Sequence, residues 1–125
     1  MRALGLLSKP AGKGKGKAER IDRELPYAAM MITMMASSGV SPYESFKKLC
    51  AVDLLPAIQG EAEDLTRQVE VVGYDPLTVM SRKAEGAKSK LYREFLAGYV
   101  SSVRGGSSVL NFLKSKLRSI FEVKG

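Results

Sequence analysis

The stretch LLPAIQGEAEDLTRQVEVVGYDP, residues 54–76, carries the pattern that decides the fold. Its apolar residues recur at spacings of three and four, which places their side chains on one face of an α-helix. The other faces carry Gln59, Glu63, Thr66, Arg67 and Glu70. We expect Glu63 and Arg67 to pair one turn apart. The stretch therefore predicts a helix with a single buried stripe. That stripe consists of Leu54, Ile58, Ala62, Leu65, Val69 and Val72.

Proline and glycine mark both ends of this predicted helix. We expect Asp53 to cap its start, and Pro56 is tolerated because it lies in the first turn. Gly73 offers the left-handed conformation that commonly ends a helix. Asp75-Pro76 then combines a capping side chain with a proline at the first helical position, so another helix should begin there.

The same punctuation continues toward the N-terminus. Ser41-Pro42-Tyr43-Glu44 has the form of a capping box, with a glutamate three residues after the capping serine. It predicts a short second helix that ends near Cys50. Before it, Gly39 should end a first helix running from about Arg23 to Ser38. The inward face of this first helix is expected to hold Leu25, Ala28, Ile32 and Met35.

Three further helices are predicted toward the C-terminus, at Asp75–Gly86, Ser89–Arg104 and after Gly105-Gly106. Gly98 lies inside the fifth helix, where it costs about 1 kcal/mol relative to alanine, so we expect another helix to approach it closely. The fold class is therefore all-α, an antiparallel bundle of about six helices over residues 24–125. The expected core positions are Leu77, Met80 and Ala84, then Leu91, Phe95, Leu96, Tyr99 and Val103, then Leu110, Leu113, Leu117, Ile120 and Lys124.

Composition excludes several kinds of site. The 125 residues include no histidine and one cysteine, so a Cys/His zinc cluster, a Ser-His or Cys-His dyad and a disulfide framework within the chain are all ruled out. Cys50 is interpreted as a packing residue. The carboxylate pair Glu61 and Asp64, and the pair Glu63 and Glu70, are expected on the solvent side of their helix. We therefore predict that the protein is not an enzyme and uses no metal or cofactor.

The net charge of +7 is unevenly distributed. Residues 1–23 carry +5, residues 24–85 carry −4 and residues 86–125 carry +6. A patch of one sign favours docking on an acidic partner, although an ordinary solvated surface has the same composition. The candidate docking residues are Arg82, Lys83, Lys88, Lys90, Arg93, Lys114, Lys116 and Arg118.

Residues 1–23 are rich in glycine and lysine and are predicted to be a flexible cytoplasmic tail or linker. Such a tail is attracted to anionic lipid or nucleic acid, or it is a linker kept soluble by its charge. The longest apolar run, Ala28–Ala36, is far shorter than the roughly 20 residues that cross a bilayer. We interpret that run as part of a buried core helix.

Five elements follow one another along the chain: Leu25-Pro26, Ser38–Pro42, Gly73–Pro76, Glu94–Gly98, and Gly105-Gly106 before Leu110 and Leu113. Their order resembles the type II secretion F domain, most closely its archaeal and tight-adherence branch, over about residues 24–125. Phe46 and Val79-Met80 depart from it, since the family often has an Ala-Leu pair there. Ser107 stands where an acidic residue commonly follows the two glycines.

The resemblance implies a cytoplasmic domain of a membrane-embedded assembly platform for an archaellum, a type IV pilus or a type II secretion machine. Its expected partners are a hexameric secretion ATPase, pilin-like subunits and further platform copies, as in a homodimer. It would lie on the cytoplasmic side of the cell membrane, held there by flanking transmembrane helices outside this sequence, and would bind no nucleotide or nucleic acid.

Two alternatives remain open. A small basic helical protein that binds nucleic acid would account for the positive charge. A helical enzyme that works through a carboxylate and a lysine is the third class, although no clustered polar motif favours it.

Overall fold

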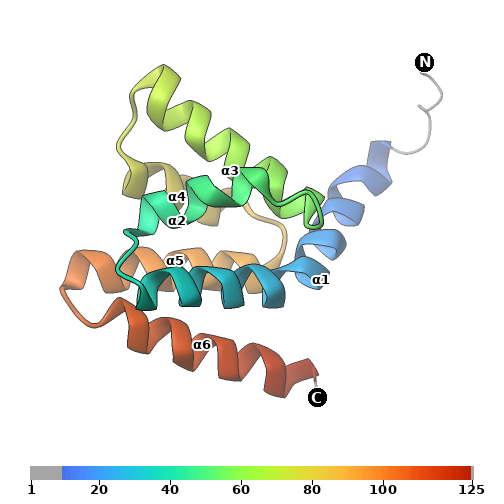
Figure 1. Cartoon of the computed structure of the whole chain (residues 1–125). Coiled ribbons are helices and arrows are strands. Elements are labelled where there is room, and N and C mark those ends of the chain that lie inside the picture. The colour runs from blue at the N-terminus through green and yellow to red at the C-terminus, as the bar shows by residue number, and fades with distance from the viewer. Residues whose placement is uncertain (1–9, 125) are drawn as a thin grey trace.

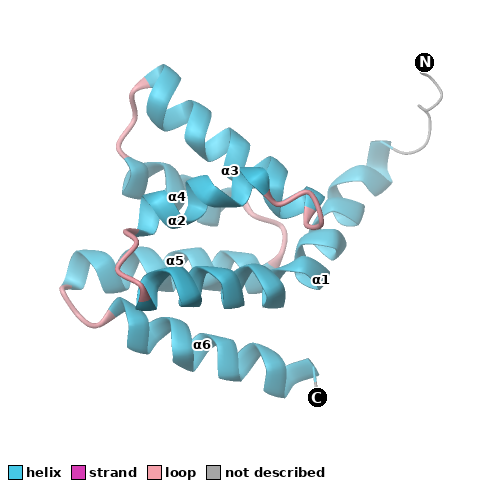
Figure 2. Cartoon of the chain, in the orientation of Figure 1, coloured by secondary structure: helices cyan, strands magenta, loops and turns pink. Residues whose placement is uncertain are grey.

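The computed structural model describes the backbone of residues 10–124 and the side chains of residues 16–122. Over this range the protein forms six α-helices and no strand, which confirms the predicted all-α class (Figure 2). A 3₁₀ turn at Leu49–Ala51 follows the second helix, and a π-helical turn at Gln68–Val72 extends the third. The α-helices are α1 (Pro10–Ser37), α2 (Pro42–Lys48), α3 (Pro56–Arg67), α4 (Pro76–Gly86), α5 (Lys90–Gly105) and α6 (Val109–Lys124).

The helices form two groups that enclose one core. The C-terminal part of α1 and helix α5 lie between α6 on one side and α2, α3 and α4 on the other (Figure 1). An aromatic row crosses the core, since the ring of Tyr99 lies 5.7 Å from those of Phe46 and Phe95. Phe112 on α6 extends the row, 6.3 Å from Phe95. The row therefore joins α2, α5 and α6.

Most predicted helix ends are confirmed. Gly73 has a φ angle of 96° and ends the α3 segment, and Gly106 has a φ of 75° at the end of α5. The carboxylate of Asp75 accepts the backbone N–H of Thr78 at 3.0 Å, which caps α4. Ser41 likewise accepts the N–H of Glu44 at the start of α2. These short-range signals work because each involves residues within one helical turn.

The start of α1 corrects the sequence prediction. Residues 10–23 were expected to belong to a flexible tail, but they form the first half of a 28-residue helix. Ile21 is buried in the core, and the Lys17 ammonium pairs with a carboxylate on α3. Glycines weaken a helix by only about 1 kcal/mol each, so such packing is sufficient to stabilise it. The predicted tail over residues 1–9 lies outside the described residues.

The apolar stripe predicted for α3 is correct only in its centre. Ile58, Ala62 and Leu65 are buried, but Leu54 is 89% exposed and Val72 is 58% exposed. Leu54 lies outside the helix, which begins at Pro56. The π-helical turn changes the register near the other end, which moves Val72 off the buried face.

Two polar contacts of α3 also differ from the prediction. Asp53 does not cap the helix; its carboxylate accepts a hydrogen bond from the side chain of Gln59 at 2.8 Å. Arg67 pairs with Asp64, three residues before it, and Glu63 forms no ion pair within the described side chains. The backbone N–H groups at the start of α3 are instead bound by Glu24 of α1.

The prediction of a close helix approach at Gly98 is confirmed. A methyl group at this position would lie 2.4 Å from a ring carbon of Phe112, on α6. The absence of a side chain at Gly98 therefore lets α6 lie against α5 with the ring of Phe112 between them.

Candidate functional site

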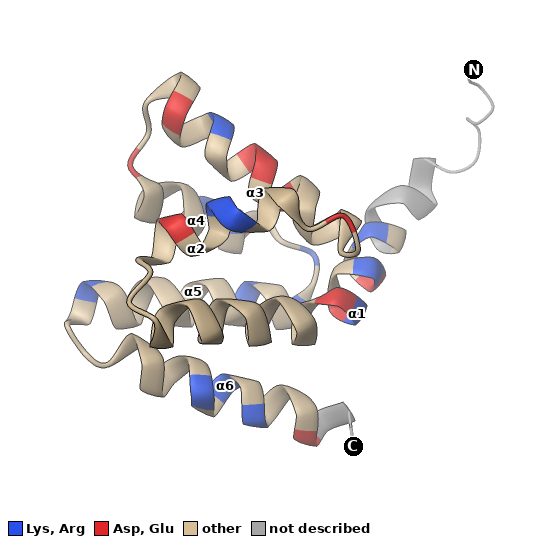
Figure 3. Cartoon of the chain, viewed as in Figure 1, with Lys and Arg blue, Asp and Glu red and all other residues tan. Residues whose placement is uncertain are grey.

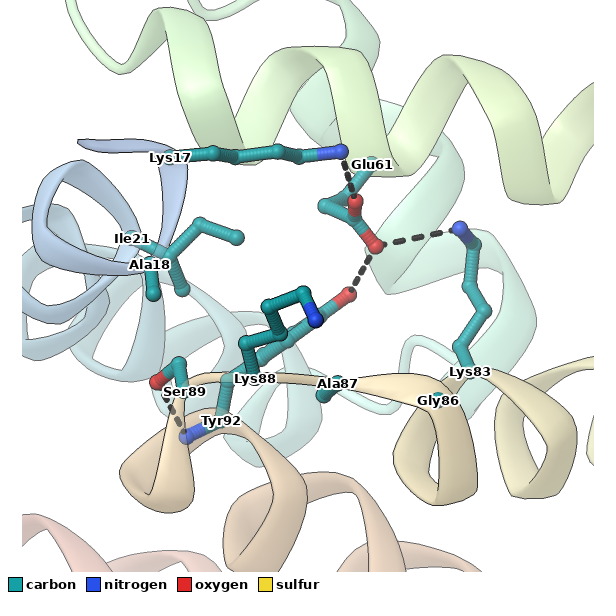
Figure 4. Close-up of a pocket in the computed structure, with 10 residues that line it drawn as sticks. All are labelled: Lys17, Ala18, Ile21, Glu61, Lys83, Gly86, Ala87, Lys88, Ser89 and Tyr92. Carbon is teal, nitrogen blue, oxygen red and sulfur yellow. Dashed lines mark hydrogen bonds and ion pairs between the residues drawn. The ribbon is translucent and has the colours of Figure 1, made fainter. Parts of the chain in front are cut away.

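A cavity of about 290 Å³ lies between the first half of α1, the middle of α3 and the connection from α4 to α5 (Figure 4). Ile21 and Ala18 form part of its apolar wall. Its polar wall carries several charged groups from three helices and one loop. These polar residues are Lys17, Glu61, Lys83, Lys88, Ser89 and Tyr92.

The carboxylate of Glu61 is the centre of this wall. Its Oε2 atom lies 2.9 Å from the Nζ atom of Lys17. Its Oε1 atom lies 3.0 Å from Nζ of Lys83 and accepts a hydrogen bond from the hydroxyl of Tyr92 at 3.1 Å. Lys83 also contacts Oδ2 of Asp64 at 2.8 Å. One buried carboxylate on α3 thus binds side chains from α1, α4 and α5 (Figure 4).

These contacts determine the protonation of the group. Burial raises the pKa of Glu61, but the hydrogen bonds and charges of Lys17 and Lys83 outweigh it and hold the pKa below its ordinary value. Burial, with the nearby Glu61 charge, raises the pKa of Tyr92 well above 10. At neutral pH the wall therefore combines an ionised carboxylate with a protonated phenol.

This arrangement suits a structural role. Both oxygens of Glu61 are already bound by donors, so neither is free to accept a proton from a substrate. The sequence prediction that Glu61 faces solvent is wrong, since the residue is 9% exposed. The spacing of residues 58, 61, 62 and 65 indicates that Glu61 lies on the buried face, because positions i, i+3, i+4 and i+7 share one face of a helix. The charge of Glu61 favours an exposed position, and only its partners on other helices make its burial possible.

A second polar contact lies beside Tyr92. The Ser89 hydroxyl caps α5 by accepting the backbone N–H of Tyr92 at 3.1 Å, and it donates to the carboxylate of Asp22 on α1. Asp22 and Lys17 therefore both connect the first half of α1 to the remainder of the bundle. Sequence reasoning identified neither contact, because the partners lie far apart along the chain.

The structure does not bring all the predicted docking residues to one surface. Lys83 is turned inward, with a side chain only 12% exposed and bound by Glu61 and Asp64, so its assignment to a docking surface is corrected. Arg82 lies over the ring of Tyr74 at 4.8 Å. Lys116 is 3.6 Å from Glu94, which links α6 to α5.

The other predicted docking residues are exposed in two groups, which Figure 3 shows as blue segments at the start of α5 and along α6. Among the described side chains, none of these residues forms an ion pair within 4.0 Å. Arg93 does donate to the carbonyl of Ala87 at 2.9 Å. The first group is Lys88, Lys90 and Arg93, and the second is Lys114 and Arg118.

Three other features bear on function. Cys50 is partly buried against the core, with its sulfur 3.5 Å from the hydroxyl of Thr66, which agrees with its predicted packing role. Among the described residues, no group of histidine, cysteine and carboxylate side chains has the composition to hold a metal ion. Over residues 10–124, no helix combines the length and the apolar character that crossing a membrane requires.

The chain is similar to the uncharacterized protein MJ1286 of Methanocaldococcus jannaschii, with 27% identity over 106 residues. The aligned part is 85% of this chain but 18% of that relative, so the chain spans less than a fifth of the relative's length. No known protein family matches the chain. No solved structure matches it.

Proposed function

We propose that this chain is the cytoplasmic domain of a membrane-embedded assembly platform, of an archaellum, a type IV pilus or a type II secretion machine. In this role it couples a hexameric secretion ATPase to the assembly of filament subunits. The observation that carries the proposal is the order of helix ends, which resembles the F domain of such platforms. Gly39, Ser41-Pro42, Gly73 and Asp75-Pro76 all lie at helix ends in the bundle, which supports that comparison.

The packing supports a mechanical role. Close-packed interiors transmit displacement with little compression, so a force on one helix moves its neighbours. The aromatic row joins α2, α5 and α6, and the contacts of Glu61 join α1, α3, α4 and α5. A domain of this kind moves as one body between the ATPase and the membrane, and it performs this role without being an enzyme.

The ATPase contact is assigned to the start of α5. Lys88, Lys90 and Arg93 are exposed there and form no ion pair with a described side chain. Charges of one sign at the rim of an interface accelerate association with a surface of the opposite sign. We therefore expect an acidic surface on the ATPase to face this group.

The test is the affinity of the purified chain for the cognate hexameric ATPase. We expect the charge reversal K88E/K90E/R93E to weaken binding about tenfold or more, mainly by slowing association. The matched control is Lys48→Glu, an exposed lysine on α2. If the triple variant binds the ATPase with the same affinity as the unmodified chain, these residues do not form the ATPase contact. Failure of the unmodified chain to bind the ATPase at all would contradict the platform function.

Nucleic-acid binding remains the second candidate because residues 86–125 carry +6. Titration of fluorescent duplex DNA and RNA of generic sequence at several salt concentrations separates the two. A binding constant whose logarithm falls steeply with the logarithm of the salt concentration would favour nucleic-acid binding, particularly if the chain does not bind the ATPase.

A further inference from the structure

The exposed face of α1 carries one continuous stripe. Arg20, Arg23, Tyr27, Met30 and Met34 follow one another at spacings of three, four, three and four, and all are exposed. This spacing places side chains along one side of a helix. Tyr27 is 53% exposed and Met34 is 67% exposed. We call these five residues the α1 stripe.

The stripe differs from scattered apolar residues on a surface. The opposite face of α1 is already packed, since Leu25, Ala28 and Ile32 are each 1% exposed. Tyr27 to Met34 thus form a second apolar strip on the same helix. Tyrosine, methionine and arginine are enriched at protein interfaces, and methionine adapts its shape to a partner.

The two arginines indicate the chemistry of the partner. Within the described side chains, neither Arg20 nor Arg23 forms an ion pair within 4.0 Å. Both lie at one end of the stripe, within two turns of Tyr27. A helix that covers the apolar part and continues along α1 therefore meets two guanidinium groups, which match carboxylates in geometry and charge.

A second copy of α1 does not satisfy these arginines. In a parallel pair, arginine would face arginine. In an antiparallel pair centred on Met30, Arg23 would face Ser37, and Arg20 would lie opposite Val40, beyond the end of the helix. Neither arrangement places a carboxylate opposite Arg20 or Arg23.

We propose that the α1 stripe binds an amphipathic helix of another protein segment, whose apolar residues cover Tyr27, Met30 and Met34 and whose carboxylates pair with Arg20 and Arg23. This surface is on a different helix from the α5 group assigned to the ATPase. The inference therefore does not depend on the proposed function.

The test uses a synthetic 21-residue helical peptide with leucines at positions i, i+3 and i+7. Its two glutamates lie one and two turns beyond the leucines, which matches the spacing of Arg23 and Arg20 from Tyr27. Its control has lysine in place of each glutamate. NMR titration of the labelled chain is expected to show saturable shifts of α1 amides with the glutamate peptide and binding at least tenfold weaker with the lysine peptide. Shifts confined to other helices, no saturable binding, or equal binding of both peptides would overturn the proposal.

Two variants test the two halves of the stripe. We expect Y27S/M30S/M34S to weaken peptide binding at least tenfold. R20E/R23E should do the same and reverse its salt dependence, because added salt would then screen a repulsion between carboxylates. The matched control is Leu54→Ser, which changes an 89% exposed apolar residue outside α3. Thermal unfolding of each variant verifies that the fold is retained.

Two further measurements address other occupants. Association of the chain with vesicles of anionic phospholipid, without binding of the glutamate peptide, would assign the stripe to a membrane surface and overturn the proposal. Self-association that Y27S/M30S/M34S abolishes, again without peptide binding, would assign it to a second copy and overturn it equally.

Discussion

The carboxylate of Glu24 on α1 caps α3 through Ile58, whose backbone N–H donates to Oε1 at 2.8 Å across a separation of 34 residues. Oε2 accepts the N–H of Ala57 at 3.2 Å. The first N–H groups of a helix have no partner within the helix, and a negative charge there also interacts favourably with the helix dipole. The residue at the N-cap of α3, Leu55, makes no capping bond of its own. A distant helix therefore performs the function that a local side chain usually performs.

The first prediction follows from this contact. We expect Glu24→Ala to lower the free energy of unfolding by about 1–2 kcal/mol, because two N–H groups lose their acceptor. Glu24→Gln should cost less, since the amide oxygen still accepts one hydrogen bond. Asp53→Ala, which removes the local carboxylate, is the control and should cost less than Glu24→Ala. Chemical denaturation measures all three, and a larger loss for Asp53→Ala would show that the cap is local.

The second prediction concerns the pH dependence of stability. The pKa of Glu61 is lower in the fold than its ordinary value of 4.5, so the unfolded chain binds more protons between the two values. The stabilisation is therefore complete above pH 4.5 and is lost as the pH falls through the folded-state pKa. We expect Glu61→Gln to be less stable by about 1–3 kcal/mol at pH 7, with the difference narrowing in acid.

Urea denaturation at several pH values measures this difference. Glu63→Gln, an exposed substitution two residues along the same helix, is the matched control and should change stability by less than about 0.5 kcal/mol. A difference between Glu61→Gln and the unmodified protein that widens below pH 4.5 would contradict the assigned ion pairs.

The third prediction concerns the contact of α5 with α6. In Gly98→Ala the new methyl group displaces the ring of Phe112, which costs about 1–3 kcal/mol. Alanine favours a helix over glycine by only roughly 1 kcal/mol, so we expect a net loss of stability. With Phe112→Ala already present, the same change should stabilise the protein. A double-mutant cycle by thermal unfolding measures the coupling, and additive effects would contradict the contact.

The fourth prediction tests whether the first half of α1 belongs to the folded domain. Ile21 is 5% exposed, so Ile21→Ala should lower the free energy of unfolding by about 2–4 kcal/mol. Met34→Ala, on the exposed face of the same helix, should change it by less than about 0.5 kcal/mol. Equal and small effects of the two substitutions would show that residues 16–23 belong to a flexible tail, as the sequence predicted.

Much of the fold was predictable because its signals are local. A cap, a proline at the first helical position and a glycine with positive φ act within one turn, so Ser41, Asp75 and Gly73 mark helix ends whatever lies around them. Gly98 also predicted a close approach correctly. Its partner Phe112 was not predictable, because the pairing depends on how α6 is placed along α5.

The sequence alone therefore determined the helical class, most of the helix ends between residues 37 and 109, and most of the buried apolar positions. Only the tertiary structure decided the roles of its charges: Glu24 caps a distant helix, Glu61 and Lys83 are buried together, and Lys17 extends the domain beyond the predicted boundary. The physical reason is that hydrophobic periodicity is a property of one helix, whereas a charge is buried only when partners from other helices surround it.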